Sequence, residues 1–182
     1  MSMFKPLSTA CLLTLALGAG AALAQSPTVG PPDLGKPISE ADIKAWDITI
    51  LPDGSNLPAG SGTVSQGAKL FVEKGCIACH GEGGKGGPNA ALFSDEKLDR
   101  IEANKTIGNF WGYPTPVFDF IRRAMPYPQP RTLSNDEVYA LTAYVLYLNK
   151  LIGENEVMDA KTLPQVKMPN RDNFIMPYPD RL

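Results

Sequence analysis

The sequence predicts an all-α fold in which one helical domain lies between an N-terminal and a C-terminal extension. Three stretches carry apolar side chains at helical spacing, at about 65–74, 116–124 and 134–150. The flanking segments 25–62 and 151–182 are rich in Pro, Gly and polar residues, yet they contain scattered apolar side chains. A disordered segment usually contains few such side chains, so we expect both extensions to be ordered and to pack on the domain.

The N-terminus has the pattern of a secretory signal peptide over residues 1–24. An apolar run from Leu7 to Leu23 follows Lys5 and ends in Ala22-Leu23-Ala24, an A-x-A cleavage site. An uncleaved membrane anchor is the alternative. The run is rich in Ala, Gly and Thr, however, whereas a spanning helix usually needs about 20 strongly apolar residues. We therefore expect export to the periplasm, cleavage before Gln25 and no membrane span afterwards.

Signal cleavage leaves an N-terminal extension at 25–62, a domain at 63–150 and a C-terminal wrapping tail at 151–182. The formal net charge of the whole chain is −2, and it becomes about −3 when Lys5 is lost. We therefore expect no nucleic-acid partner. Cys11 is lost with the signal, so the mature chain keeps two cysteines.

Those two cysteines belong to Gly75-Cys76-Ile77-Ala78-Cys79-His80-Gly81, which contains the C-x-x-C-H pattern of c-type haem attachment. Thioether bonds from Cys76 and Cys79 would hold the porphyrin, and His80 would bind the iron as the proximal ligand. The chain contains one histidine, so a second haem of this type is excluded. We expect one covalently attached haem c.

Two other interpretations of the motif are less consistent with the sequence. A structural zinc site needs about four nitrogen or sulfur ligands, and the mature chain offers Cys76, Cys79 and His80. A thioredoxin-like dithiol is typical of a β-α-β pattern, whereas a helix precedes this motif and a glycine-rich loop follows it. Covalent haem therefore remains the preferred interpretation.

The segments on either side of the motif are expected to lie close to the haem. The helix at 65–74 contains Gly67, which indicates close approach of another backbone. The loop 81–88 contains five glycines, which would let the chain pass close to the porphyrin. The carbonyl group of Pro88 is expected to accept a hydrogen bond from the outer ring nitrogen of His80 and so to orient the ring.

Aromatic side chains, including Trp111 and Tyr113, gather between 105 and 113. Aromatic rings with nearby cations suit the rim of a haem, where an apolar face ends in two carboxylates. The same residues are equally compatible with ordinary core. The next helix is expected from about Pro116 to Ala124. We expect its Arg122 either to face a haem propionate or to lie beside the surface on which a redox partner docks.

The last helix has the clearest boundaries. Ser134-Asn135-Asp136-Glu137 predicts a capping box. A continuous apolar stripe follows, formed by Leu141, Tyr144, Val145 and Leu148. We expect this face to cross the first helix near Gly67 and Phe71.

Methionine is the best candidate for the second axial ligand, because no second histidine and no spare thiol remain. Met125 follows a helix and precedes Pro126, so a proline-stiffened loop would hold its sulfur against the iron. The alternative role for Met125 is a core residue that fills a gap. Met168 and Met176, which also precede prolines, are the next candidates for the ligand.

Together, these features resemble class I cytochromes c. More specifically, they resemble the cytochrome subunit of periplasmic sulfite and sulfane dehydrogenases of sulfur-oxidising bacteria. The segments that carry this resemblance are Ala45-Trp46-Asp47, Leu51-Pro52-Asp53-Gly54, Phe118 to Pro126, Ser134 to Tyr144 and Met168 to Asp172. The resemblance implies a class I cytochrome c fold with His80 and Met125 as axial ligands.

The resemblance also implies a function, namely an electron-transfer protein that accepts electrons from a molybdenum sulfite or sulfane dehydrogenase. Electrons would then pass to a downstream cytochrome or oxidase of the respiratory chain. A generic carrier that feeds a terminal oxidase is one alternative. An enzyme or gas-binding protein is another, but it needs an open sixth position on the iron. Members of the family can carry a second haem domain, so both a stable complex and a transient encounter with the dehydrogenase stay open.

Overall fold

The computed structural model describes residues 34–44 and 46–174. The chain divides into two units, one within residues 1–42 and one within 43–182. The predicted signal peptide and Met176 lie outside the described residues. No helix in the described ranges combines the length and the apolar character needed to cross a membrane.

The first helix of the described chain is α1 (Glu40–Lys44), whose start is capped by Ser39. The Ser39 hydroxyl accepts a hydrogen bond from the Asp42 N–H, and the Asp42 carboxylate accepts one from the Ser39 N–H at 2.9 Å. Ile43 and Trp46, however, are exposed, and Trp46 keeps 80% of its surface accessible. The expectation that the apolar side of this segment packs on the domain is wrong for these two residues.

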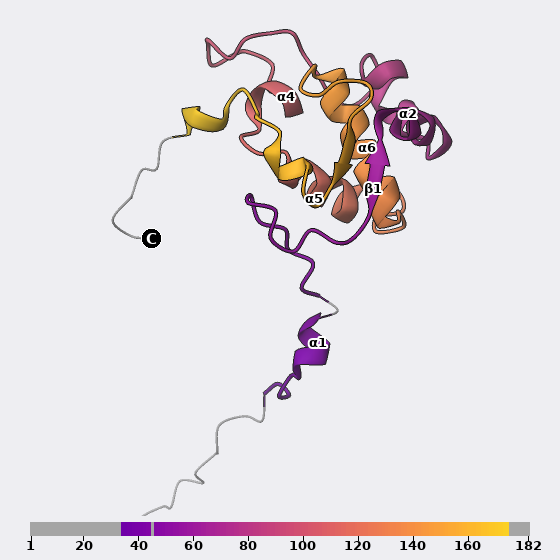
Figure 1. Ribbon diagram of the computed structural model, residues 1–182, viewed down its shortest axis with the longest axis vertical. Coiled ribbons are helices and arrows are strands. Elements are labelled where there is room, and N and C mark those ends of the chain that lie inside the picture. The colour runs from indigo at the N-terminus through magenta and orange to yellow at the C-terminus, as the bar shows by residue number, and fades with distance from the viewer. Residues whose placement is uncertain (1–33, 45, 175–182) are drawn as a thin grey trace, which may run out of the picture. The chain divides into compact units, whose positions relative to one another are not determined.

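The larger unit is mostly helical and is built around the crossing of α2 (Val64–Glu73) and α6 (Asn135–Leu148), as Figure 1 shows. A Cβ on Gly67 would overlap the carbonyl oxygen of Ala140, so the two backbones touch. The Phe71 and Tyr144 rings lie 5.4 Å apart at the same crossing. The predicted contact between the two helices near Gly67 and Phe71 is therefore confirmed.

Capping boxes define where both of these helices begin. In α6, the Ser134 hydroxyl accepts the Glu137 N–H, and the Glu137 carboxylate accepts the Ser134 N–H at 2.8 Å. Thr63 and Gln66 form the same arrangement at the start of α2. The α6 box is the predicted one, whereas α2 begins one residue before the predicted Ser65, because Thr63 is its cap.

Four further helical segments complete the part of the domain that surrounds the motif. They are α3 (Cys76–His80), the 3-10 turn η1 (Glu82–Gly84), α4 (Ile107–Phe110) and α5 (Thr115–Ala124). The α5 helix begins one residue before the predicted Pro116 and packs against α6. Its Phe118 ring lies 4.4 Å from the ring of Tyr139 in the centre of the core.

A small sheet that the sequence does not predict joins the two ends of the domain. Strand β1 (Ser61–Thr63) pairs antiparallel with β2 (Val157–Asp159), with Gly62 opposite Met158. Each strand has three residues, which is too short for an alternating pattern to be recognised. Gly62 also lies against the backbone of Ala140 in α6, so the sheet fixes both extensions on the same helix.

Hydrogen bonds hold the segment that precedes β1 on the helices. The buried Tyr139 hydroxyl donates to the Pro58 carbonyl oxygen at 2.9 Å, and burial raises the pKa of this phenol to about 12. Thr115 donates to the Pro52 carbonyl at 3.2 Å. Ile50 lies in the core, so the chain is anchored from residue 50 onwards.

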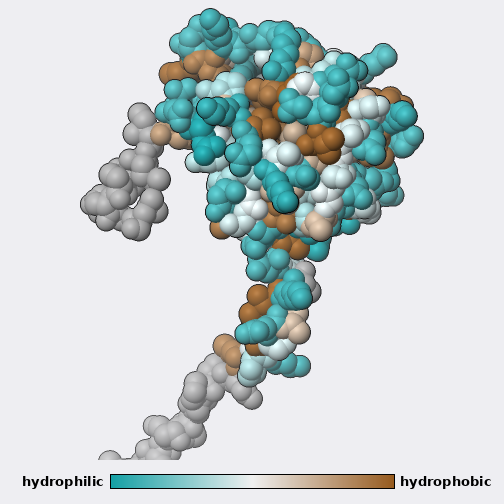
Figure 2. Space-filling view, viewed as in Figure 1, coloured by the Kyte–Doolittle hydropathy of each residue, from teal (hydrophilic) through white to brown (hydrophobic). Residues whose placement is uncertain are grey.

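The C-terminal segment after α6 also contributes to the core through its apolar side chains. Two further 3-10 turns, η2 (Leu163–Gln165) and η3 (Arg171–Asn173), shape this segment. Its buried residues are Ile152, Met158, Leu163, Val166 and Met168. On the face of the molecule seen in Figure 2, hydrophobic residues gather in separate patches among hydrophilic ones.

Candidate haem-binding site

The C-x-x-C-H motif forms the one-turn helix α3, which follows α2 after a sharp change of direction at Gly75. Gly75 has φ 75°, a left-handed conformation that favours glycine. Because α3 is helical, Cys76 and Cys79 lie about one turn apart, and His80 follows directly. This arrangement presents two thiols and an imidazole from one short segment.

The two thiols are free and partly accessible. Cys76 and Cys79 are both half-buried and form no disulfide. The pKa of the Cys76 thiol is raised above its ordinary value, mainly because the thiol is buried, so the neutral thiol is favoured there. Both residues are therefore partly accessible to a group that binds outside the core.

The His80 ring is oriented by the loop that follows it. Its Nδ1 atom lies 3.0 Å from the carbonyl oxygen of Ala90. A carbonyl oxygen only accepts, so Nδ1 is the donor of this bond, and in the neutral imidazole Nε2 keeps its lone pair for a metal. The expectation that Pro88 supplies this carbonyl group is wrong, because the accepting group lies two residues further along the chain.

The path of the loop explains this difference. The Asn89 N–H donates to the Cys79 carbonyl oxygen at 2.9 Å, so the chain is attached to α3 just before Ala90. A Cβ on Gly87 would overlap the same carbonyl group of Cys79. The glycine-rich loop therefore folds directly onto the motif, and the residue after this attachment, Ala90, turns its carbonyl group towards His80.

The described methionines differ in accessibility, and the difference favours Met125 as the second axial ligand. Met158 and Met168 are 1% and 3% exposed, so protein atoms already enclose both side chains. Met125 ends α5 and packs on the core while part of its surface remains accessible. Met125 is therefore the described methionine that keeps accessible surface for a group that binds against the core.

The predicted aromatic residues lie in the segment that joins α4 to α5. Trp111 is half-buried and packs edge-to-face on Phe120, with 6.0 Å between the ring centroids. Tyr113 carries the guanidinium group of Arg171 over its ring at 4.0 Å. Arg122 is half-buried on α5, and its charge acts on the phenol of Tyr139, where it partly opposes the rise in pKa.

Arg171 was not predicted as a site residue, although it lies on a segment that carries the family resemblance. It is separated from Tyr113 in the chain by α5, α6, β2 and η2, and no local pattern connects the two residues. In the sequence, the resemblance at Met168 to Asp172 was the signal that included Arg171 itself.

The donor set fits a covalent haem better than a zinc ion. Within the described residues, no three side chains of the types His, Cys, Asp and Glu converge to hold a metal ion. A zinc site built on Cys76, Cys79 and His80 therefore lacks further ligands. Two accessible thiols, an oriented imidazole and one accessible methionine are the donors that a His/Met c-type haem requires.

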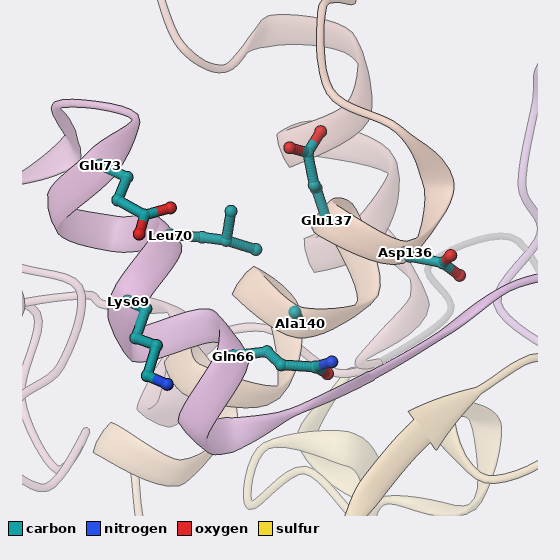
Figure 3. Close-up of a pocket in the computed structure, with 7 residues that line it drawn as sticks. All are labelled: Gln66, Lys69, Leu70, Glu73, Asp136, Glu137 and Ala140. Carbon is teal, nitrogen blue, oxygen red and sulfur yellow. The ribbon is translucent and has the colours of Figure 1, made fainter.

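A groove of about 290 Å³ lies between α2 and α6. Figure 3 shows that its walls carry charged side chains around two apolar ones. The lining residues are Gln66, Lys69, Leu70, Glu73, Asp136, Glu137 and Ala140. None of the predicted haem-binding residues lines it, so this groove is separate from the candidate site.

Comparisons with known proteins agree with this geometry. A family model described as "Cytochrome c" matches residues 64–149. The structure is similar to a chain of the sulfane dehydrogenase SoxCD from Paracoccus pantotrophus, with 37% sequence identity and a TM-score of 0.72. That similarity covers 83% of this chain and 73% of the SoxCD chain. A search of curated protein sequences found no match.

Proposed function

The chain belongs to the cytochrome c family, and from this we propose that it accepts electrons from a periplasmic sulfite or sulfane dehydrogenase. It then passes them towards the respiratory chain. One observation carries this proposal: the 37% identity that extends over 73% of a chain from a sulfane dehydrogenase. The 83% of this chain that the likeness covers is more than the proposed haem domain alone.

Four residues hold the cofactor in this proposal. Cys76 and Cys79 would attach one haem through thioether bonds, and His80, through Nε2, and Met125 would bind its iron. When bound, the haem supplies an iron that gains and loses one electron. The bond between His80 and Ala90 fixes the ring orientation, and such outer bonds tune the ligand.

Iron ligation by both His80 and Met125 would favour a carrier over an enzyme or a gas-binding protein. Those functions need an open or displaceable sixth position and usually a polar distal group. The chain contains one histidine, and His80 is that residue, so no distal histidine is present. Met125 then occupies the position that a substrate or gas would need.

The proposed location is the periplasm, because residues 1–24 have the pattern of a cleaved secretory signal. Residues 63–150 form the proposed haem domain, between the N-terminal extension and the C-terminal tail. Expression in a host that matures c-type haem, followed by periplasmic extraction and N-terminal sequencing, tests this. The mature chain is expected to begin at Gln25.

The function is tested by stopped-flow reduction of the purified ferric cytochrome by a sulfite or sulfane dehydrogenase with its substrate. We expect rapid appearance of the ferrous spectrum that depends on both enzyme and substrate. Reduction by ascorbate serves as the control for a competent haem. A cytochrome that ascorbate reduces, but that the dehydrogenase with substrate reduces no faster than the dehydrogenase alone, would instead be a generic carrier to an oxidase.

A further inference from the structure

The C-terminal segment 168–174 is fixed against the segment that carries Trp111 and Tyr113. The Asn170 side-chain amide donates to the Phe110 carbonyl oxygen at 2.6 Å. The Phe174 ring packs edge-to-face on the Phe110 ring, with 6.2 Å between centroids. Met168 anchors the start of this segment in the core. Arg171 is therefore held in a defined place beside Tyr113, one of the predicted haem-rim residues.

Within this segment, the position and the bonding of Arg171 are unusual. Its guanidinium group lies 4.0 Å from the centroid of the Tyr113 ring, well within the range of a cation–π contact. Its side chain makes no ion pair and no hydrogen bond with any residue in the described ranges. By contrast, the α5 residue Arg123 is paired with Asp119 at 2.8 Å. Within the described residues, the guanidinium group of Arg171 is therefore held in place by Tyr113 while its N–H donors have no protein acceptor.

We propose that Arg171 binds a propionate group of the haem, so that the segment 168–174 forms part of the haem pocket. A guanidinium group can donate two parallel hydrogen bonds to a carboxylate, and the contact with Tyr113 holds it ready to do so. This segment lies beyond residues 64–149, which the family model matches. The inference rests on the proposed function, because it requires a bound haem.

The test compares Arg171→Gln with the wild-type haem protein at one pH and one ionic strength. Arg171 is exposed, so the substitution removes no core contact. We expect the propionate bending bands of the resonance Raman spectrum to shift, because the carboxylate loses its donors. We also expect the midpoint potential to fall, because an unpaired negative charge favours the ferric iron. Arg171→Lys should restore most of the potential but not the Raman bands, since lysine lacks the planar fork.

Arg131→Gln is the matched control. Arg131 is also exposed, and within the described residues it makes no ion pair and no contact with an aromatic ring. If the two glutamine variants change the bands and the potential equally, the proposal is wrong, because only the general surface charge matters. If Arg171→Gln lowers the melting temperature but leaves the bands unchanged, Arg171 is a structural clamp and the proposal is again wrong.

The haem content separates this proposal from the proposed function. A pyridine haemochrome assay of the wild-type protein measures whether a c-type haem is attached at all. A protein without haem would contradict the proposed function itself. A protein with haem, whose Raman bands do not respond to Arg171→Gln, would overturn only the role of Arg171.

Discussion

Gly67 of α2 lies directly against the carbonyl group of Ala140 in α6, with no room for a side chain between the two backbones. This close approach brings Phe71 and Tyr144 into contact one turn further along. Because α3 follows α2 after a single glycine turn, the crossing also sets the position of the C-x-x-C-H motif. The packing of two helices therefore determines where the candidate site lies.

Gly67→Ala is predicted to destabilise the protein by about 2 kcal/mol or more. Overpacking of a tight contact typically costs about 1–3 kcal/mol, and the better helix propensity of alanine, about 1 kcal/mol, offsets only part of a backbone overlap. Urea unfolding followed by circular dichroism measures the change. Gly153→Ala is the control, because a Cβ there meets only an ordinary contact with Glu156 at 3.4 Å. Equal stability of the two variants would contradict the prediction.

Features encoded within one or two turns of chain were predictable from the sequence. The capping box at Ser134 and Glu137 depends on residues three positions apart, and the structure contains it. Gly67 in an otherwise good helix indicated a close contact, and α6 makes that contact. The mostly helical cytochrome c fold followed from such features together with the motif.

Features that join distant segments were not predictable in the same way. The strands β1 and β2 pair across almost the whole domain, and three residues carry no detectable period. Ala90 accepts the His80 hydrogen bond through its backbone, so its side chain gave no signal. Trp46 was expected to pack because it is large and apolar, but residue type alone does not say whether a partner surface exists.

Met125→Ala is predicted to abolish the weak far-red band that arises from sulfur bound to ferric haem, and to lower the midpoint potential. The reason is that Met125 is the described methionine with accessible surface, and its loss would leave the sixth position to a weaker or different ligand. Visible absorption spectroscopy and a redox titration of the purified protein measure both effects.

Met168→Leu is the matched control for that prediction. Met168 is enclosed in the core, and leucine nearly conserves its volume, so the far-red band should persist with a stability change below about 1.5 kcal/mol. If instead the band survives in Met125→Ala and disappears in Met168→Leu, the axial ligand is Met168. Survival of the band in both variants would leave Met176 as the candidate for the axial ligand.

Glu137→Gln is predicted to destabilise the protein by about 1 kcal/mol at neutral pH, and less at acidic pH. The ion pair with Lys74 at 2.7 Å is the main cause that lowers the pKa of Glu137 below its ordinary 4.5, and the Ser134 N–H adds to it. A carboxyl group whose pKa is lower in the folded than in the unfolded protein stabilises the fold at pH values above its unfolded pKa. This stabilisation is lost as the pH falls through the folded pKa. Urea unfolding at pH 7 and pH 3 measures the difference between variant and wild type.

Glu154→Gln controls for the loss of a surface carboxylate. Glu154 is exposed and makes no ion pair in the described ranges, so its substitution should change stability by less than about 0.5 kcal/mol at either pH. The Glu137 prediction is contradicted if its variant is as stable as wild type at pH 7. It is equally contradicted if the loss of stability grows rather than shrinks at pH 3.

Lys85 lies in the glycine-rich loop that folds onto the motif, with its Nζ atom 5.6 Å from the centroid of the Phe93 ring. It is exposed, and it makes no ion pair with any described residue. In the proposed function, an electron donor would approach a haem attached at Cys76 and Cys79, so a positive charge in this loop would steer an acidic partner surface. Weak redox contacts are typically smaller than about 1,200 Å², and in such contacts charge acts mainly on the association rate.

Lys85→Glu is therefore predicted to slow reduction by the dehydrogenase at low salt and to have little effect at high salt. Screening explains the difference, because the Debye length falls from about 10 Å at 0.1 M to about 3 Å at 1 M. Stopped-flow rates at several salt concentrations measure the effect, and Lys161→Glu, an exposed charge reversal next to β2, is the control. If the two reversals slow reduction equally, or if neither rate responds to salt, the partner docks away from the glycine-rich loop.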